Sequence, residues 1–258
     1  MAYRMDVYRN ARRKKPDRFM QHFRCLVVSI AIAAAVVCSA STMRSANVLS
    51  EVKRHLAEGH KFAADGSWEI AAAHADVVLI SENVSVYVNV DHVSSSQRQA
   101  CLRALDAALS QWESALDSTI HFQMQSDPSR ADLKVIFRPD VRMGREAVAG
   151  LTNWTRSIHA SGNKVTQASF KAEVQIRARD LEYHELSFEA MRQETEHEFG
   201  HVLGLDDSDH LGDLMGLFDI NHLVTGPRDY EIQAVRNLRN EASQIKADAL
   251  ARRDDKGK

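Results

Sequence analysis

The chain has 258 residues, enough for one medium-sized domain with additional segments, and 44% of the residues are hydrophobic. Its 33 Lys and Arg residues are balanced by 35 Asp and Glu residues, and the formal net charge of −2 excludes a strongly basic nucleic-acid-binding protein. Of three cysteines, two lie in the N-terminal segment described next. The third, Cys101, is therefore expected to be a buried thiol without an internal disulfide partner.

The first 40 residues combine a basic head with a short apolar run. Eight Arg and Lys residues precede an uncharged stretch at 25–37, and small residues follow up to Ala40. This layout is typical of a secretory signal peptide cleaved after Ala40, or of a retained membrane anchor over residues 25–40. Both alternatives place everything after residue 41 outside the cytoplasm, so we expect a secreted or extracytoplasmic protein that meets a membrane only through this segment.

Residues 41–80 carry apolar side chains at helical spacing, for example Val48, Val52 and Leu56. Gly59 and the Asp65-Gly66 pair are expected to interrupt the helical pattern. The segment is interpreted as a linker, a short propeptide or a packed N-terminal arm, and its pattern does not separate these alternatives.

Residues 81–240 alternate strand-like and helix-like patterns, which is typical of a single α/β domain. The predicted elements, in chain order, are a strand from Asn83, a helix at 94–117, strands at 120–124, 133–137, 149–154 and 168–176, a helix at 188–203 capped by Ser187, and a last helix opened by Pro227. Residues 241–258 are charged and are expected to form a frayed tail.

The richest chemistry lies between residues 197 and 207. His197 and His201 are four residues apart, so on a helix both imidazoles project from one face and can reach one Zn²⁺ at about 2.0–2.1 Å. Glu198 adjoins the first histidine and is suited to act as the general base on a zinc-bound water. Gly204 can adopt a positive φ and end the helix, which would return Asp207 toward the same metal as a third ligand.

This motif resembles that of the metzincin metallopeptidases, His-Glu-x-x-His-x-x-Gly-x-x-His/Asp followed by a methionine turn. The continuation at 207–215 resembles that of the matrixins, and Met215 stands where the turn methionine would lie beneath the zinc. Residues 131–137 are similar to the matrixin third strand. The resemblance implies an α/β zincin fold, with a mixed twisted sheet, a backing helix, an active-site helix and a C-terminal helix. It also implies one catalytic Zn²⁺ and a peptide or protein substrate.

Three departures from the matrixin pattern matter. Most matrixins have histidine as the third ligand, whereas Asp207 is similar to the aspartate of snapalysin-type enzymes, and His210 stays open as an alternative third ligand. Only His159 lies between residues 139 and 176, so the second, structural zinc of matrixins is not expected. No cysteine is present for a matrixin-type cysteine switch between Ser39 and Ala100.

Residues 149–154 weakly resemble the family's edge strand, and Gly150 and Leu151 are the residues expected to pair with an extended substrate. The leading hypothesis is a zinc metalloendopeptidase, a hydrolase of peptide bonds that uses Glu198 and a zinc-bound water. The alternative is a non-catalytic, zinc-stabilised binding module at the cell surface. Glu198 argues against the module, because a structural zinc site has no use for a base and is closed by four protein ligands.

Overall fold

The structure is a computed structural model that describes residues 44–162 and 164–256. The expected signal peptide or anchor at 1–40 lies outside the described residues. Among the helices that are described, none combines the length and apolar composition needed to cross a bilayer.

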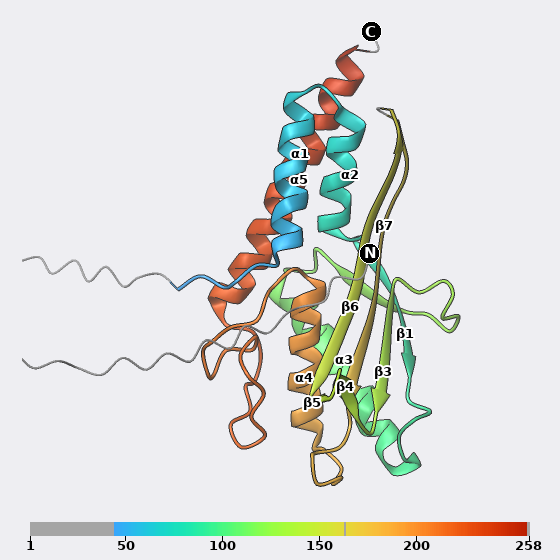
Figure 1. Cartoon of the computed structure of the whole chain (residues 1–258), viewed down its shortest axis with the longest axis vertical. Coiled ribbons are helices and arrows are strands. Elements are labelled where there is room, and N and C mark those ends of the chain that lie inside the picture. The colour runs from blue at the N-terminus through green and yellow to red at the C-terminus, as the bar shows by residue number, and fades with distance from the viewer. Residues whose placement is uncertain (1–43, 163, 257–258) are drawn as a thin grey trace, which may run out of the picture. The chain divides into compact units, whose positions relative to one another are not determined.

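A five-stranded mixed sheet forms the centre of the fold, in the order β2-β1-β3-β7-β6 (Figure 1). Its strands are β1 (Asn83–Asn89), β2 (His121–Met124), β3 (Leu133–Arg138), β6 (Gly150–Ser161) and β7 (Lys164–Arg177). The pairs β2–β1, β1–β3 and β3–β7 are parallel, whereas the edge strand β6 pairs antiparallel to β7. The α/β fold with a mixed sheet is confirmed.

Two helices cover this sheet and enclose the main core. They are α3 (Ser95–Ala115) and α4 (Phe188–Val202), which pack against each other. Alternate residues of β1 and β3 are fully buried beneath them, namely Val84, Val86, Leu133, Val135 and Phe137. Cys101 of α3 is also fully buried, as expected, and burial raises the pKa of its thiol to about 12.

Two features of the sheet were not predicted. β6 and β7 form a hairpin that is much longer than the two short strands expected, because its far half alternates polar with half-buried residues and carries little apolar signal. A small hairpin of β4 (Val141–Met143) and β5 (Glu146–Val148) turns at Gly144, whose φ is +65°. Strands of three residues are too short for a period-two pattern to be recognised.

Three helices form a layer beside the upper half of the β6–β7 hairpin (Figure 1). We refer to them as the helical layer. They are α1 (Ser50–Ala64), α2 (Trp68–Leu79) and α5 (Asp229–Lys256). The layer has its own apolar core, made of Leu49, Val52, Leu56, Ala71, Ala72, Ala75, Val78, Leu238, Ala242, Ile245 and Ala249. The described part of 41–80 is thus a pair of packed helices.

Two expectations about these helices are wrong. Residues 241–256 do not fray but continue α5, because Ala242, Ile245 and Ala249 bury their side chains against the neighbouring helices. Gly59 does not interrupt α1; it lies inside the helix, where a Cβ would stand 3.2 Å from Cγ2 of Ile245. A glycine there allows α1 and α5 to approach closely.

Candidate metal centre

Helix α4 has one face in the core and one face toward the site. Ser187 caps its first turn, because the Ser187 hydroxyl accepts a hydrogen bond from the backbone N–H of Ala190 at 3.1 Å. Four side chains on the core face are fully buried: Met191, Thr195, Phe199 and Val202. Because an α-helix repeats every 3.6 residues, His197, Glu198 and His201 then share the other side.

The helix ends at a glycine in the left-handed region. Gly204 has a φ of +106°, its N–H bonds to the carbonyl of His201 at 3.1 Å, and the N–H of Leu205 bonds to the carbonyl of Gly200 at 2.9 Å. These two bonds define a Schellman end, which reverses the chain as the sequence predicted. The following residues therefore return past the imidazoles, and Asp207 lies opposite them.

Backbone carbonyls hold both imidazoles in one orientation. His197 Nδ1 lies 2.8 Å from the carbonyl oxygen of Leu214, and His201 Nδ1 lies 2.9 Å from that of Leu205. Because a carbonyl only accepts, each Nδ1 carries a hydrogen and donates it, which leaves Nε2 available to bind a cation. Both Nε2 atoms lie 3.4 Å from Oδ1 of Asp207.

The spacings from Asp207 to the two imidazoles suit a zinc ion. Around a tetrahedral zinc with bonds of about 2.0–2.1 Å, neighbouring donors lie about 3.3–3.4 Å apart, which agrees with the spacings to Asp207. Two imidazoles and one carboxylate also form a known donor set for catalytic zinc, in which the fourth position stays open. The two Nδ1 bonds supply the outer support that metal-binding histidines need.

The electrostatics of the site favour a cation. Burial lowers the pKa of His197, but the carboxylates of Asp207, Glu194 and Glu198 outweigh burial and raise it to about 10. The pKa of His201 is raised as well, by Asp207 and Glu198 against the effect of burial. Burial raises the pKa of Asp207, yet its contacts with the two imidazoles hold it well below its usual range. Protons and a metal ion therefore compete for the same two imidazoles.

Glu198 is close to the imidazoles but is held by a different partner. Its donor atom and those of His197 and His201 all lie within 4.8 Å of one another. However, Oε2 of Glu198 accepts a hydrogen bond from the hydroxyl of Thr152 at 2.5 Å. Asp207, by contrast, has its Oδ1 within 3.4 Å of both imidazoles.

Glu194 is a second acid at this place. It is buried one helical turn before Glu198, and burial raises the pKa of its carboxyl, with the Glu198 charge acting in the same direction. The sequence motif does not include Glu194 or Thr152. Thr152 could have been found only by extending the period-two pattern from Gly150, which places both residues on one face of the strand.

Met215 lies beneath the helix, at the place expected for the turn methionine. A Cβ on Gly200 of α4 would stand 2.3 Å from the Met215 sulfur, so the two are in tight contact. The backbone N–H of Met215 donates to Oε1 of Glu231 at 2.9 Å, and Glu231 also accepts from the N–H of Arg228 at 2.7 Å. Glu231 is fully buried and ties the start of α5 to this turn.

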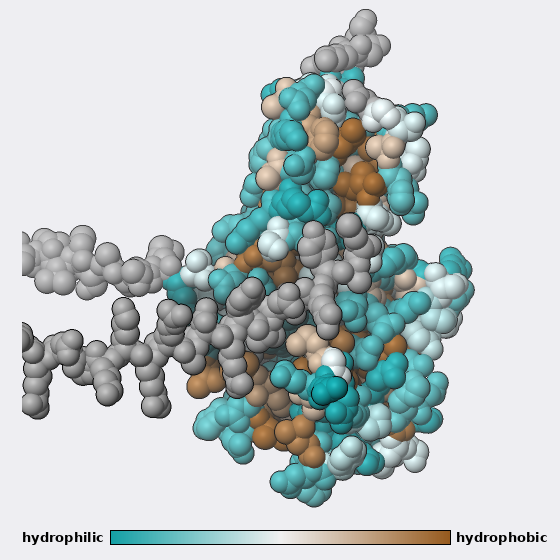
Figure 2. All heavy atoms as spheres, viewed as in Figure 1, coloured by the Kyte–Doolittle hydropathy of each residue, from teal (hydrophilic) through white to brown (hydrophobic). Residues whose placement is uncertain are grey.

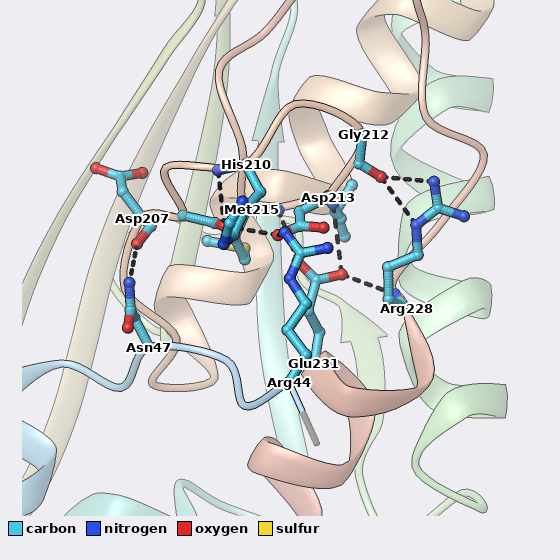
Figure 3. A network of polar contacts seen from close by, with 11 residues as sticks. Arg44, Asn47, Asp207, His210, Gly212, Asp213, Met215, Arg228 and Glu231 are labelled. Atoms are coloured by element: carbon cyan, nitrogen blue, oxygen red, sulfur yellow. Dashed lines mark hydrogen bonds and ion pairs between the residues drawn. The ribbon is translucent and has the colours of Figure 1, made fainter. Parts of the chain in front are cut away.

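An N-terminal strap, residues 44–49, runs beside the loop that carries Asp207 (Figure 3). Asn47 donates its side-chain amide to the carbonyl of Asp207 at 2.8 Å, and its own carbonyl accepts from the N–H of Asp206 at 3.0 Å. Arg44 pairs with Asp213 at 2.8 Å. The strap therefore supports the loop through contacts that no local sequence pattern predicts.

His210 belongs to a different part of this loop. It helps to line a cavity of about 190 Å³ together with Arg44, Asp213 and Tyr230. Figure 3 shows the Asp207 carboxylate turned away from that polar network, whereas His210 lies beside it. The side chain of Asp207, rather than that of His210, contacts both imidazoles.

Gly150 and Leu151 lie at the start of the edge strand β6. The N–H of Arg177 bonds to the carbonyl of Ala149 at 2.8 Å, so in this antiparallel pair Leu151 also directs its backbone groups toward β7. Gly150 directs its backbone groups toward the open edge. Of the two residues, only Gly150 therefore has its backbone groups on the open edge.

The sequence matches the profile of one protein family, described as matrixin, over residues 80–233. A search of curated proteins found no match. The matched region runs from the start of β1 through the metal centre to the first turn of α5. Because it takes in more than half of the chain, the chain belongs to the matrixin family of zinc metallopeptidases.

Proposed function

We propose that the chain is a zinc-dependent endopeptidase in which His197, His201 and Asp207 bind the metal and Glu198 moves the proton. The convergence of the two Nε2 atoms on one Asp207 oxygen, each at 3.4 Å, is the observation that carries this proposal. When bound there, Zn²⁺ acts as a Lewis acid toward the scissile carbonyl and toward water.

Glu198 is placed for general acid–base catalysis. Its Oε2 is anchored by Thr152, and no donor from the described residues is recorded at Oε1. Oε1 can therefore accept a proton from the attacking water and pass it to the nitrogen of the leaving amine. Such a base contributes about 10²- to 10⁴-fold to the rate.

An extended peptide would bind along the open edge of β6. The backbone groups of Gly150, Thr152 and Trp154 point away from β7 by the same alternation, and no described residue is recorded as bonding to them. The loop between α4 and α5 exposes large apolar side chains, at Leu211, Leu217 and Ile220. Figure 2 shows apolar residues gathered over this loop, which Figure 1 draws in orange at the lower left.

The alternative, a zinc-stabilised binding module without catalysis, has less support. The site offers three protein donors to a zinc and keeps Glu198 beside them, whereas a structural zinc is closed by four donors. Secretion, or tethering to a membrane through residues 25–40, belongs to this proposal as well. N-terminal sequencing of the exported protein distinguishes the two.

The test is cleavage of an unstructured protein by the full chain, with and without a chelator, and by the Glu198→Gln variant. We expect chelation to abolish cleavage and Glu198→Gln to lower kcat/KM by about 10²-fold or more, with the zinc content unchanged. Glu189→Gln, an exposed acid on the first turn of the same helix, is the matched control and should behave as wild type. Full cleavage by Glu198→Gln, or a purified chain without stoichiometric zinc, contradicts the proposal.

A further inference from the structure

The carboxylate of Glu198 is enclosed on the side that faces β6. Thr152 is buried and presents its hydroxyl to Oε2 of Glu198 at 2.5 Å. The same hydroxyl lies 3.3 Å from the backbone carbonyl of Glu198, but it has one hydrogen to donate. The shorter contact and the charged acceptor both favour the carboxylate, because hydrogen bonds to ionised groups are the stronger ones.

Gly150 closes the other side of this enclosure. A Cβ on Gly150 would stand 2.4 Å from Oε1 of Glu198 and 2.6 Å from Oε1 of Glu194. Real Cβ atoms do not approach this closely, so both carboxylates depend on the absence of a side chain at this position. Gly150 and Thr152 are two residues apart on β6 and therefore face α4 together.

We infer that Thr152 is a positioning residue for peptide hydrolysis: its hydroxyl, with Gly150 beside it, sets the rotamer in which Glu198 presents Oε1 for proton transfer. This inference rests on the proposed function of Glu198. The side chain of Thr152 touches neither the substrate nor the metal donors in this scheme and acts only through Glu198. Without the bond at Oε2, the glutamate side chain gains rotamers in which Oε1 no longer faces the reacting water.

The strand itself offers the matched control. Thr155 lies three residues further along β6, on the opposite face, and is exposed. Thr152→Val and Thr155→Val make the same chemical change, the loss of a hydroxyl with the β-branched shape retained. Thr152→Ser keeps the hydroxyl and tests whether the donor, rather than the methyl group, is needed.

We expect Thr152→Val to lower kcat by about 10- to 100-fold, because a hydrogen bond to a charged group is lost, while KM stays within about twofold. Thr152→Ser should recover most of kcat, and Thr155→Val should match wild type. All three should keep stoichiometric zinc. A Thr152→Val variant with kcat within twofold of wild type, or one whose loss appears equally in Thr155→Val, overturns the inference.

A second measurement tests the contact without using activity. Thermal unfolding of zinc-loaded wild type, Thr152→Val, Glu198→Ala and the double variant forms a double-mutant cycle. Thr152→Val should lower Tm in wild type and have little effect when Glu198 is already alanine. Equal Tm changes in both backgrounds would show that the hydroxyl does not act through Glu198. Because this cycle needs no catalysis, an inactive wild type would contradict the proposed function and leave this test intact.

Discussion

The side chains of the metal centre differ in how far away in sequence their partners lie. His197, Glu198 and His201 were predicted because helical periodicity alone places them on one face. Asp207 followed from one further local rule, the turn at Gly204. Thr152 and Asn47 were not predicted, because strand pairing and the docking of the strap bring them to the site from 46 and 160 residues away.

The third ligand is open to a direct test at this level. We expect Asp207→Ala to weaken zinc binding by more than about 100-fold, because the loss of even an outer partner of a metal ligand costs about 10- to 100-fold. His210→Ala should bind zinc within a few-fold of wild type, since its side chain lines the cavity beside the strap and is not recorded against the imidazoles. Zinc titration against a competing chelator measures both. A larger loss in His210→Ala would make His210 the ligand.

Among the helices and strands, those with a strong period were predicted well. β1, β3 and α3 have alternating or stripe-like apolar residues, and their observed bounds lie close to the predicted ones. The far half of the β6–β7 hairpin was missed. Most of its residues are exposed, so pairing between the two strands rather than an apolar pattern determines the structure there.

The start of α4 gives a second prediction, because this helix carries most of the metal centre. Ser187→Ala removes the cap bond to the N–H of Ala190 and should cost about 1 kcal/mol of unfolding free energy. Ser94 stands at the N-cap position of α3, the residue before the helix, and makes no such bond; its hydroxyl contacts Glu185 instead. Ser94→Ala is therefore the control, expected within about 0.5 kcal/mol of wild type. Urea unfolding compares them, and equal losses would argue against the cap.

At the largest scale, residues 44–256 consist of the matched matrixin region and the helical layer, most of which lies outside the match. The layer is not separate from the site, because Trp154 of β6 connects the two. Its ring stacks near His201, with centroids 6.4 Å apart, and its indole N–H donates to Glu51 of α1. Arg156, two residues further on, donates to the carbonyls of Val77 in α2 and Val202 in α4. The layer therefore supports the last turn of the active-site helix.

A buried histidine pair within the layer makes its stability depend on pH. His55 of α1 and His74 of α2 face each other with their Nδ1 atoms 3.0 Å apart. Burial, and next the neighbouring His55, lower the pKa of His74 to about 4, with Arg54 acting in the same direction and Glu58 opposing. In the unfolded chain a histidine titrates near about 6.5. Between these values the unfolded chain binds a proton that the folded chain does not, so stability is lost as the pH falls from about 6.5 to about 4.

We expect this histidine to cost wild type about 2 kcal/mol of unfolding free energy between pH 7.5 and pH 5, since each pKa unit corresponds to about 1.4 kcal/mol. His74→Asn removes the titrating group but keeps a polar atom toward His55, so its loss over the same range should be smaller by about that amount. His92→Asn makes the same change at an exposed histidine outside the layer and is the matched control. Contributions from the metal centre cancel in the comparison, because all three proteins share it. Urea unfolding at both pH values, with zinc in constant excess, measures these free energies. Equal losses of unfolding free energy in wild type and His74→Asn would mean that the pair does not control the stability of the layer.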